Sequence, residues 1–436
     1  MARAKKETAL TPEERLQAAL VPDWEWPHKL PENWCWTYLT KAAECLDNFR
    51  KPINATERAG RNGNVPYYGA TGQVGWIDDF LTDEDLVLLG EDGAPFLDLI
   101  KDKAYLITGK AWVNNHAHIL RSLFGDTGNR YLLHYLNSFN YEGYVNGTTR
   151  LKLTRASMDT IPIPLPPLAE QQRIVDRIES LFAKLDEAKE KAQAVVDSFE
   201  NRKAAILHKA FTGELTAKWR EEHGVSIDNW KTTRFDSVAA IRSNLVDPAE
   251  YQSFPHIAPD NIEKKTGVLL EYHTIAEDGV TSGKHSFYSG QILYSKIRPY
   301  LSKAVVVDFD GLCSADMYPI EAYQNARCLW YYMLSDEFLL QASTAGSRSV
   351  LPKINQKELS ALTVHLPTND REQEEIARIL DELFDKEQQT KEAAEVVLDQ
   401  IDLMKKSFLV RAFRGELGTN DPNEESAVEL LKRTIL

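Results

Sequence analysis

Cysteine is scarce in this sequence, and long apolar runs are missing. Its four cysteines, Cys35, Cys45, Cys313 and Cys328, form neither a Cys-x-x-Cys pair nor a set with metal-ligand spacing, which argues against a disulfide framework and a zinc site. No stretch approaches the roughly 18 unbroken apolar residues of a membrane span, and residues 1–10 lack the apolar core of a signal peptide. We therefore expect a soluble, cytoplasmic protein without a membrane partner.

Sequence motifs for catalysis are missing as well. Residues 69–75 lack the Gly-Lys-Ser/Thr of a phosphate-binding loop, and no Asn-Pro-Pro-Phe or Asp-Pro-Pro-Tyr box for amino methylation is present. Residues 259–265 resemble a nuclease motif, but two residues between Asp260 and Glu263 are too few for the hairpin that would bring both carboxylates to a metal. His116 and His118 have no third ligand at metal spacing. We expect no catalytic residue, metal site or cofactor in this chain.

An excess of positive charge is also absent, since the net charge is -14. Nucleic-acid binding normally requires a basic surface. However, half of the excess acid, -7, lies in residues 367–436, and cations cluster locally around Arg150, Lys296 and Lys353. A basic groove on an acidic chain is therefore compatible with the composition.

The chain contains an internal repeat. Residues 170–215 align without a gap to residues 372–417, with 18 identities in 46 positions and a shared Phe-x-Gly-Glu-Leu ending. Upstream, Asn33-Trp34 matches Asn229-Trp230 more weakly. The sequence therefore predicts two copies of a globular part followed by a helix. Short apolar runs separated by Gly, Pro and Asn turns predict mixed α and β structure in each globular part.

The repeated segments are predicted to be long helices with a coiled-coil seam. Apolar residues follow a heptad spacing from Ile174 to Ile206, interrupted by Arg202, and the second copy keeps it with polar interruptions at Glu387 and Thr390. Gly213 and Gly415 stand where a left-handed C-terminal cap belongs. Each helix would be about 42 residues and roughly 60 Å long at 1.5 Å per residue.

Chain order then predicts the fold: α+β, with two mixed α/β recognition domains separated by two long antiparallel coiled-coil helices, as a pseudo-two-fold symmetric repeat. The predicted parts are an N-terminal extension (1–29), the first domain (30–166), helix one with its exit (167–227), the second domain (228–367), helix two (368–418) and a tail (419–436).

These features resemble the specificity subunit of Type I restriction-modification enzymes over nearly the whole chain. The family's Ile-Pro-Ile-Pro-Leu-Pro-Pro-Leu-Ala-Glu-Gln-Gln-Arg-Ile signature stands at residues 161–174. Its second copy, residues 364–376, departs from it at His365, Thr368, Asn369 and Asp370. The run at residues 213–220, Gly-Glu-Leu-Thr-Ala-Lys-Trp-Arg, is similar to the family's exit from helix one.

The resemblance implies a non-catalytic subunit that reads a bipartite, asymmetric site in double-stranded DNA across an unread gap. It also implies two methyltransferase (modification) subunits docked on the helices, joined by restriction/translocase subunits. S-adenosylmethionine, ATP and Mg²⁺ would belong to these partners. The residues expected to contact partners are Gly213, Glu214, Leu215, Gly415, Glu416 and Leu417.

Candidate DNA-contacting residues lie in matched segments of the two domains. Lys296 and Arg298 share one strand face, where Arg would fork onto guanine O6 and N7 and Lys would hold phosphate. A strand edge with solubilising charges is the alternative. The equivalent run of the first domain carries Glu91 and Asp92, which would accept from cytosine N4 or lie in a solvated turn.

Other candidates surround these runs, each with a plain turn or helix start as its alternative. They are the glycine-rich turn near Tyr67, the amides at Asn114 and Asn115, and the hydroxyl-rich loops beside Arg150 and Arg348. The full candidate set is Tyr67, Tyr68, Thr71, Gln73, Glu91, Asp92, Lys110, Asn114, Asn115, His116, Arg150, Lys152, Lys296, Arg298, Tyr300, Lys303, Ser347, Arg348, Lys353 and Asn355.

Two rival functions are compatible with parts of the sequence: a coiled-coil scaffold whose heads bind proteins, and a nuclease with an unusual site. A scaffold would not need two divergent heads on closely similar helices, whereas a reader of two unlike half-sites would. Salt-dependent binding to a specific duplex would separate the alternatives.

Overall fold

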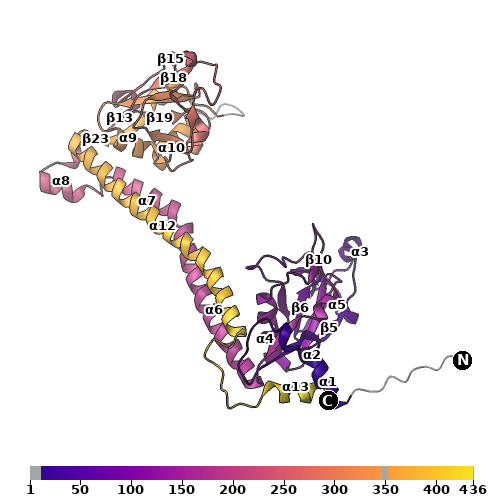
Figure 1. Cartoon of the computed structure of the whole chain (residues 1–436). Coiled ribbons are helices and arrows are strands. Elements are labelled where there is room, and N and C mark those ends of the chain that lie inside the picture. The colour runs from indigo at the N-terminus through magenta and orange to yellow at the C-terminus, as the bar shows by residue number, and fades with distance from the viewer. Residues whose placement is uncertain (1–10, 346–351, 436) are drawn as a thin grey trace. The chain divides into compact units, whose positions relative to one another are not determined.

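The computed structural model describes residues 11–345 and 352–435 (Figure 1). The chain divides into two compact units. Unit 1 combines Met1–Ala192 with Val396–Leu436, and unit 2 is Gln193–Glu395. Helices and short strands alternate in both, which confirms the expected α+β class.

Unit 1 contains two four-stranded sheets. The first has the order β2-β9-β6-β7 and is antiparallel throughout, and the second has the order β4-β3-β8-β5 with β3 and β8 parallel. The strands are β1 (Cys35–Tyr38), β2 (Ala43–Cys45), β3 (Val65–Gly69), β4 (Gly72–Ile77), β5 (Thr82–Asp83), β6 (Leu86–Gly90), β7 (Ala104–Ile107), β8 (Lys110–Val113), β9 (Ala117–Ser122), β10 (Val145–Asn146), β11 (Lys152–Leu153) and β12 (Pro162–Leu165).

Unit 2 repeats the first of these sheets, with the order β14-β22-β19-β20, and adds a five-stranded sheet, β15-β18-β21-β16-β17. In each unit a strand from the start of the domain pairs with one at its end, β1 with β12 and β13 with β23. The strands are β13 (Trp230–Arg234), β14 (Ala239–Ile241), β15 (Leu245–Val246), β16 (Pro255–Ile257), β17 (His273–Thr274), β18 (Lys284–Phe287), β19 (Ile292–Ser295), β20 (Ala304–Val306), β21 (Gly311–Cys313), β22 (Met317–Ala322) and β23 (Thr363–Pro367).

Each globular domain packs on the start of one long helix and the end of the other. In unit 1, Ile174 and Ile178 join Leu409 and Phe413 in one apolar core, and in unit 2 Leu207 and Phe211 join Ile376 and Leu380. The helices are α1 (Pro12–Ala19), α2 (Leu39–Ala42), α3 (Ala55–Ala59), α4 (Gly125–Ser138), α5 (Arg155–Asp159), α6 (Leu168–Asp197), α7 (Phe199–Phe211), α8 (Ala217–His223), α9 (Ala326–Met333), α10 (Asp336–Ala345), α11 (Gln356–Ala361), α12 (Asp370–Phe413) and α13 (Ala427–Ile435).

The long helices run antiparallel within each unit, as the sequence predicted. Lys189 Nζ lies 3.0 Å from Asp402 Oδ1 in unit 1, and Arg202 Nε lies 2.7 Å from Glu387 Oε2 in unit 2. Thus two of the three residues that interrupt the predicted apolar seams, Arg202 and Glu387, form an ion pair with each other.

Two details of the helices differ from the prediction. The first repeat has about the expected length, but the single residue Ser198 interrupts it between α6 and α7, while main-chain bonds from Ser198 to Ala194 and from Arg202 to Ser198 keep the helical spacing. The Ser198 hydroxyl donates to the Ala194 carbonyl at 2.6 Å, and the Arg202 guanidinium donates to the Val195 carbonyl at 3.1 Å. These side-chain bonds compete with the helical pattern. In α12, the expected seam residues Val397 and Met404 are exposed.

A fully buried glutamate anchors the start of each long helix. Glu372 of α12 accepts hydrogen bonds from Thr216, Asn229, Trp230 and Arg220. The equivalent residue in unit 1, Glu170 of α6, accepts from Thr419 and Arg173. In both units, therefore, the segment after the end of one helix closes onto the start of the other.

The two Gly-Glu-Leu runs take part in this closure. Gly213 and Gly415 have φ of 80° and 73°, which confirms the predicted left-handed caps. Leu215 and Leu417 pack against the core of their own unit, whereas Glu214 and Glu416 are exposed. These runs therefore have an internal structural role through their glycines and leucines, while the side chains of Glu214 and Glu416 stay exposed.

Candidate nucleic-acid interface

Four candidate segments of unit 1 meet at the end of β6. The Asn114 amide donates to the Tyr68 carbonyl at 3.1 Å, which holds the 114–116 segment against the β3–β4 hairpin. The Glu91 amide donates to the His116 carbonyl at 2.7 Å, and the Leu153 amide donates to the Glu91 carbonyl at 2.7 Å. Main-chain bonds thus bring together residues that are 25 to 62 positions apart in the sequence.

The side chains at this junction form an ion-pair cluster. Asp92 Oδ1 lies 2.8 Å from Arg150 Nη2 and 2.7 Å from His116 Nδ1. Glu91 pairs with Lys152 at 3.0 Å and with Arg50. Burial raises the pKa of Glu91, but donation from Arg50 and Lys152 outweighs it and holds that pKa below its ordinary value. Both carboxylates act as internal counterions, so the exposed groups of the cluster are cationic, with 61% of the Arg150 side chain accessible.

Next to this cluster, Cys45, Asp47 and His118 place their potential ligand atoms close together. Within residues 11–345 and 352–435, this is the one group of His, Cys, Asp and Glu side chains that could hold a metal ion. Asp47 lies 2.7 Å from His118 Nδ1 and 3.0 Å from Arg50. His118 Nε2 lies 3.0 Å from the Leu153 carbonyl. Burial raises the pKa of the Cys45 thiol to about 12. Because the Asp47 carboxylate already pairs with Arg50 and burial disfavours the Cys45 thiolate, this group supports the loops rather than suiting a metal ion.

Unit 2 reproduces the same main-chain frame with different side chains. The Lys296 amide donates to the Asp316 carbonyl at 3.0 Å, the Ile354 amide donates to the Lys296 carbonyl at 2.9 Å, and the Arg298 amide donates to the Pro352 carbonyl at 2.7 Å. The corresponding bonds in unit 1 run from the Glu91 amide to the His116 carbonyl, from the Leu153 amide to the Glu91 carbonyl, and from the Gly93 amide to the Leu151 carbonyl.

The cations of unit 2 differ in their availability. Lys353 Nζ lies 3.0 Å from Asp316 Oδ1 and is exposed, whereas Lys296 bonds to the Ala315 carbonyl, and burial lowers its pKa. Lys303 donates to the Pro259 carbonyl at 2.7 Å. Arg298 is exposed, and its guanidinium has no ion-pair partner among the residues that the structure describes.

Asp316 was not among the sequence candidates, although it anchors Lys353. The signal that could have found it is positional. It stands directly before β22, as His116 stands directly before β9, and both strands occupy the same place in their sheets.

The remaining candidates fall into four groups. Tyr67 and Asn114 are buried, so both are structural and the expectation that they contact DNA is corrected. Asn355 caps α11 through the Glu358 amide at 3.0 Å. Ser347 and Arg348 lie outside the described residues. The candidates that stay at least partly accessible are Tyr68, Thr71, Gln73, Lys110, Asn115 and Tyr300.

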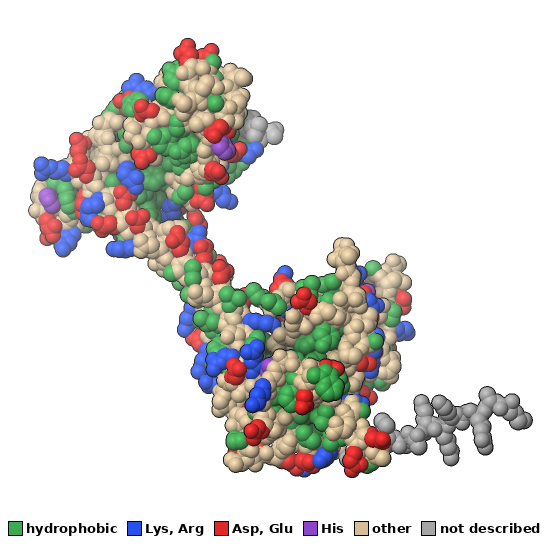
Figure 2. All heavy atoms as spheres, viewed as in Figure 1, with side chains coloured by type: hydrophobic (Ala, Val, Ile, Leu, Met, Phe, Trp, Pro, Cys, Tyr) green, Lys and Arg blue, Asp and Glu red, His purple; other side chains and the backbone are tan. Residues whose placement is uncertain are grey.

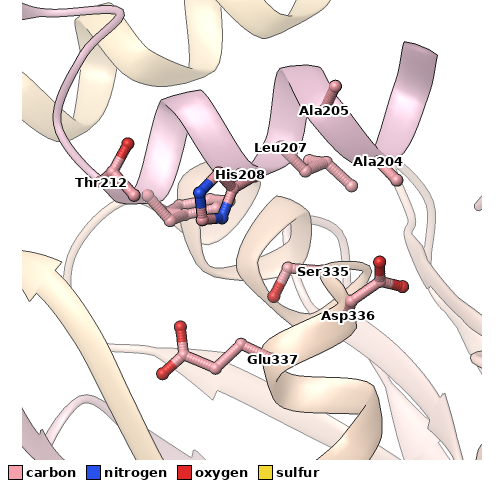
Figure 3. A pocket seen from close by; sticks show the side chains of 9 residues that line it. Ala204, Ala205, Leu207, His208, Thr212, Ser335, Asp336 and Glu337 are labelled. Atoms are coloured by element: carbon pink, nitrogen blue, oxygen red, sulfur yellow. The ribbon is translucent and has the colours of Figure 1, made fainter. Parts of the chain in front are cut away.

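Surface charge is mixed on both units. Figure 2 shows cationic and anionic side chains interspersed over the face in view, without a broad field of one sign. A hollow of about 350 Å³ in unit 2 lies between α7 and α10, where His208 and Thr212 face Asp336 and Glu337 (Figure 3). No candidate contact residue lines it. Within the described residues, every helix is too short or too polar to cross a membrane.

A family model described as the Type I restriction modification DNA specificity domain matches residues 45–196 and again 227–397, together more than half of the chain. The chain belongs to this specificity-subunit family. Its two matches agree with the internal repeat. As a Type I specificity subunit, the chain recognises DNA and is not the catalytic component.

Two relatives of this family illustrate the similarity. The specificity subunit of the Type I restriction enzyme EcoDI from Escherichia coli is 34% identical over 410 residues, which cover 89% of this chain and 90% of that protein. The EcoKI specificity subunit from Escherichia coli strain K12 is 24% identical over 320 residues, covering 66% of this chain and 65% of that protein.

Two solved structures share the fold. The HsdS subunit from Thermoanaerobacter tengcongensis matches with a TM-score of 0.58 and 17% identity, covering 90% of this chain and 100% of that one. A chain from a study of complex assembly and conformational transition of the type I R-M system matches with a TM-score of 0.63, the same identity and the same coverage. These matches support the architecture of Type I specificity subunits, with two repeated domains and long helices.

Proposed function

We propose that the chain reads a bipartite, asymmetric site in double-stranded DNA, with one half-site read by the loop cluster of each unit. The observation that carries this proposal is the shared main-chain frame at the ends of β6 and β19, which presents unlike side chains. Two loop clusters with the same main-chain hydrogen bonds would approach DNA in the same orientation, while their different side chains would select different bases.

The exposed cations of these clusters supply the contacts. In unit 1 they are Arg150 and Lys152, held by Asp92 and Glu91, and in unit 2 they are Arg298 and Lys353. A few well-placed cations give local attraction to phosphate on a chain whose net charge is -14. The negative net charge of the chain would weaken its binding to DNA sequences outside the recognition site.

Partner docking is proposed on the part of α12 that lies in unit 1. Val396, Leu403 and Val410 are exposed and seven residues apart, and Val397 and Met404 form a second exposed column. Heptad-spaced apolar residues on an exposed helix face fit another helix. We assign this surface to a methyltransferase subunit. Two such subunits and the restriction/translocase subunits would bring S-adenosylmethionine, ATP and Mg²⁺.

The test is selection from a duplex library with two randomised half-sites and variable gaps, using the full chain assembled with its modification subunits. We expect two unlike, separated consensus blocks, and binding that weakens as salt rises. Arg298→Ala should relax one block and leave the other unchanged. Arg234→Ala is the matched control, because this exposed arginine of unit 2 already pairs with Asp236. Recovery of protein partners without any sequence preference would instead support the scaffold function.

A further inference from the structure

Arg298 adopts a backbone conformation that L-residues rarely take. Its φ is 49° and its ψ is 58°, in the left-handed region, and it directly precedes Pro299. The two other described non-glycine residues with positive φ, Ser302 and Lys265, belong to the same site, since the Lys265 amide donates to the Leu301 carbonyl at 3.1 Å. Strain of this kind is retained where the surrounding structure holds it, often at functional sites.

The matching position in unit 1 is Gly93, which has a φ of 76°. The Gly93 amide donates to the Leu151 carbonyl at 3.0 Å, as the Arg298 amide donates to the Pro352 carbonyl. Glycine takes this conformation without cost, whereas arginine does not. The backbone at this position is therefore left-handed in both units, but only unit 2 has a side chain there.

In unit 1 another side chain fills that place. A Cβ atom added to Gly93 would lie 3.2 Å from Arg150 Nε and 3.6 Å from Arg150 Nη2. The guanidinium of Arg150 thus covers the glycine, held by its ion pair with Asp92. Both units therefore have an arginine at this point of the frame, in unit 1 on the loop before β11 and in unit 2 at the left-handed position itself.

We propose that Arg150 and Arg298 are equivalent specificity-determining residues, each presenting its guanidinium to a guanine edge at the same place in its own half-site. This inference rests on the proposed function. Guanine O6 and N7 accept the two parallel donors of a guanidinium, which makes arginine selective for that base. Asp92 positions Arg150, whereas the left-handed backbone positions Arg298.

The equivalence is tested by moving the arginine within unit 1. In the library selection described above, Arg150→Ala should reduce the preference for guanine at one position by roughly 5-fold to 150-fold. Adding Gly93→Arg to this variant should restore the preference, because the new side chain starts from the backbone position of Arg298. Arg155→Ala is the matched control, since this exposed arginine pairs with Asp159 outside the cluster.

In unit 2, Arg298→Gly should cause the same loss in the other half-site while keeping or raising the thermal midpoint of unfolding, since glycine relieves the strained φ. A purely structural arginine would not show that combination. If the parental chain selects a bipartite site but Gly93→Arg fails to restore the preference in a folded double variant, the equivalence is overturned. Equal weakening on all sequences with a shallower salt dependence would assign the arginines to phosphate and overturn base reading. If the parental chain selects no site, the proposed function itself fails.

Discussion

The buried glutamates at the two helix starts have opposite pKa shifts. Burial raises the pKa of both, but in Glu372 the hydrogen bonds from Arg220, Asn229, Trp230 and Thr216 outweigh it and lower that pKa below its ordinary value of 4.5. In Glu170 burial dominates, and its pKa lies above 4.5. The pKa values of equivalent residues in a duplicated chain are thus shifted in opposite directions.

We expect Glu372→Gln to destabilise unit 2 by about 3 kcal/mol, because it leaves the Arg220 guanidinium without its anionic partner. Glu170→Gln should cost less in unit 1, since burial there disfavours the charge that this substitution removes. Hydrogen exchange resolved by unit measures both effects. Glu382→Gln is the control, as an exposed pair with Arg378 contributes no more than about 1 kcal/mol. Equal losses from both buried substitutions would contradict this reading.

The sign of the pH dependence follows. Glu372, whose pKa is lowered in the folded state, contributes stability that is present above pH 4.5 and is lost as the pH falls through the folded value. Glu170, whose pKa is raised, has the reverse dependence, and its unfavourable contribution grows as the pH rises above 4.5. Acidification should therefore weaken unit 2 through Glu372 while relieving unit 1 through Glu170, a difference that exchange rates at pH 4 and pH 6 would measure.

At the scale of elements, the break at Ser198 coincides with the polar pair in the seam. Replacing one partner, as in Arg202→Leu, should destabilise unit 2, because Glu387 is then left half-buried and unpaired. The double variant with Glu387→Leu should be at least as stable as the parent, since two apolar residues continue the seam. Chemical denaturation of all four proteins gives the coupling energy, expected at about 1 kcal/mol. A double variant less stable than either single variant would show that the pair is required.

The exposed column on α12 gives a second prediction at this scale. Leu403→Lys with Val410→Lys should abolish assembly with the methyltransferase subunit, while the thermal midpoint of the chain alone changes little, because both side chains are exposed. Gel filtration of the mixed subunits measures assembly. Val74→Lys, on an exposed residue of β4, is the control. Unchanged assembly would place the partner on another surface.

The sequence predicts those elements that show a periodic apolar pattern or end in a capping residue. The structure confirms the heptad seam of the first helix, the left-handed Gly213 and Gly415 and the repeat, whereas Val397 and Met404 of the second predicted seam are exposed. The break at Ser198 depends on side-chain bonds to the carbonyls of Ala194 and Val195, which the heptad pattern does not reveal. The loop clusters depend on pairings such as Glu91 with Leu153, which are set by the tertiary fold. For that reason Asp92 was predicted to contact DNA, whereas its structural contacts are with Arg150 and His116.

At the scale of the whole molecule, we expect the length of the helices to set the gap between half-sites. The Lys189–Asp402 pair makes residues 396–402 the heptad that faces residues 189–195. Deleting both would shorten each helix by about 10 Å at 1.5 Å per residue, which is roughly three base pairs at about 3.4 Å each. Duplex DNA turns once in about 10 base pairs, so affinity should fall as the preferred gap shifts.

Library selection with variable gaps measures this shift. Deleting residues 189–195 alone is the control, because it removes one heptad without its facing partner and should destabilise the chain. A double deletion that keeps both the parental gap and the parental affinity would rule out helix length as the determinant.

The division of the chain also affects its synthesis. Unit 2 is one unbroken segment, whereas unit 1 needs Leu409, Phe413 and Thr419 to complete its core and to satisfy Glu170. A ribosome makes these residues last. Nascent domains generally fold in the order in which they emerge, but here the domain that emerges first remains incomplete until the final helix and tail are released. The second recognition domain is therefore the first to finish folding, and a chain that stops before Leu409 leaves the first one open.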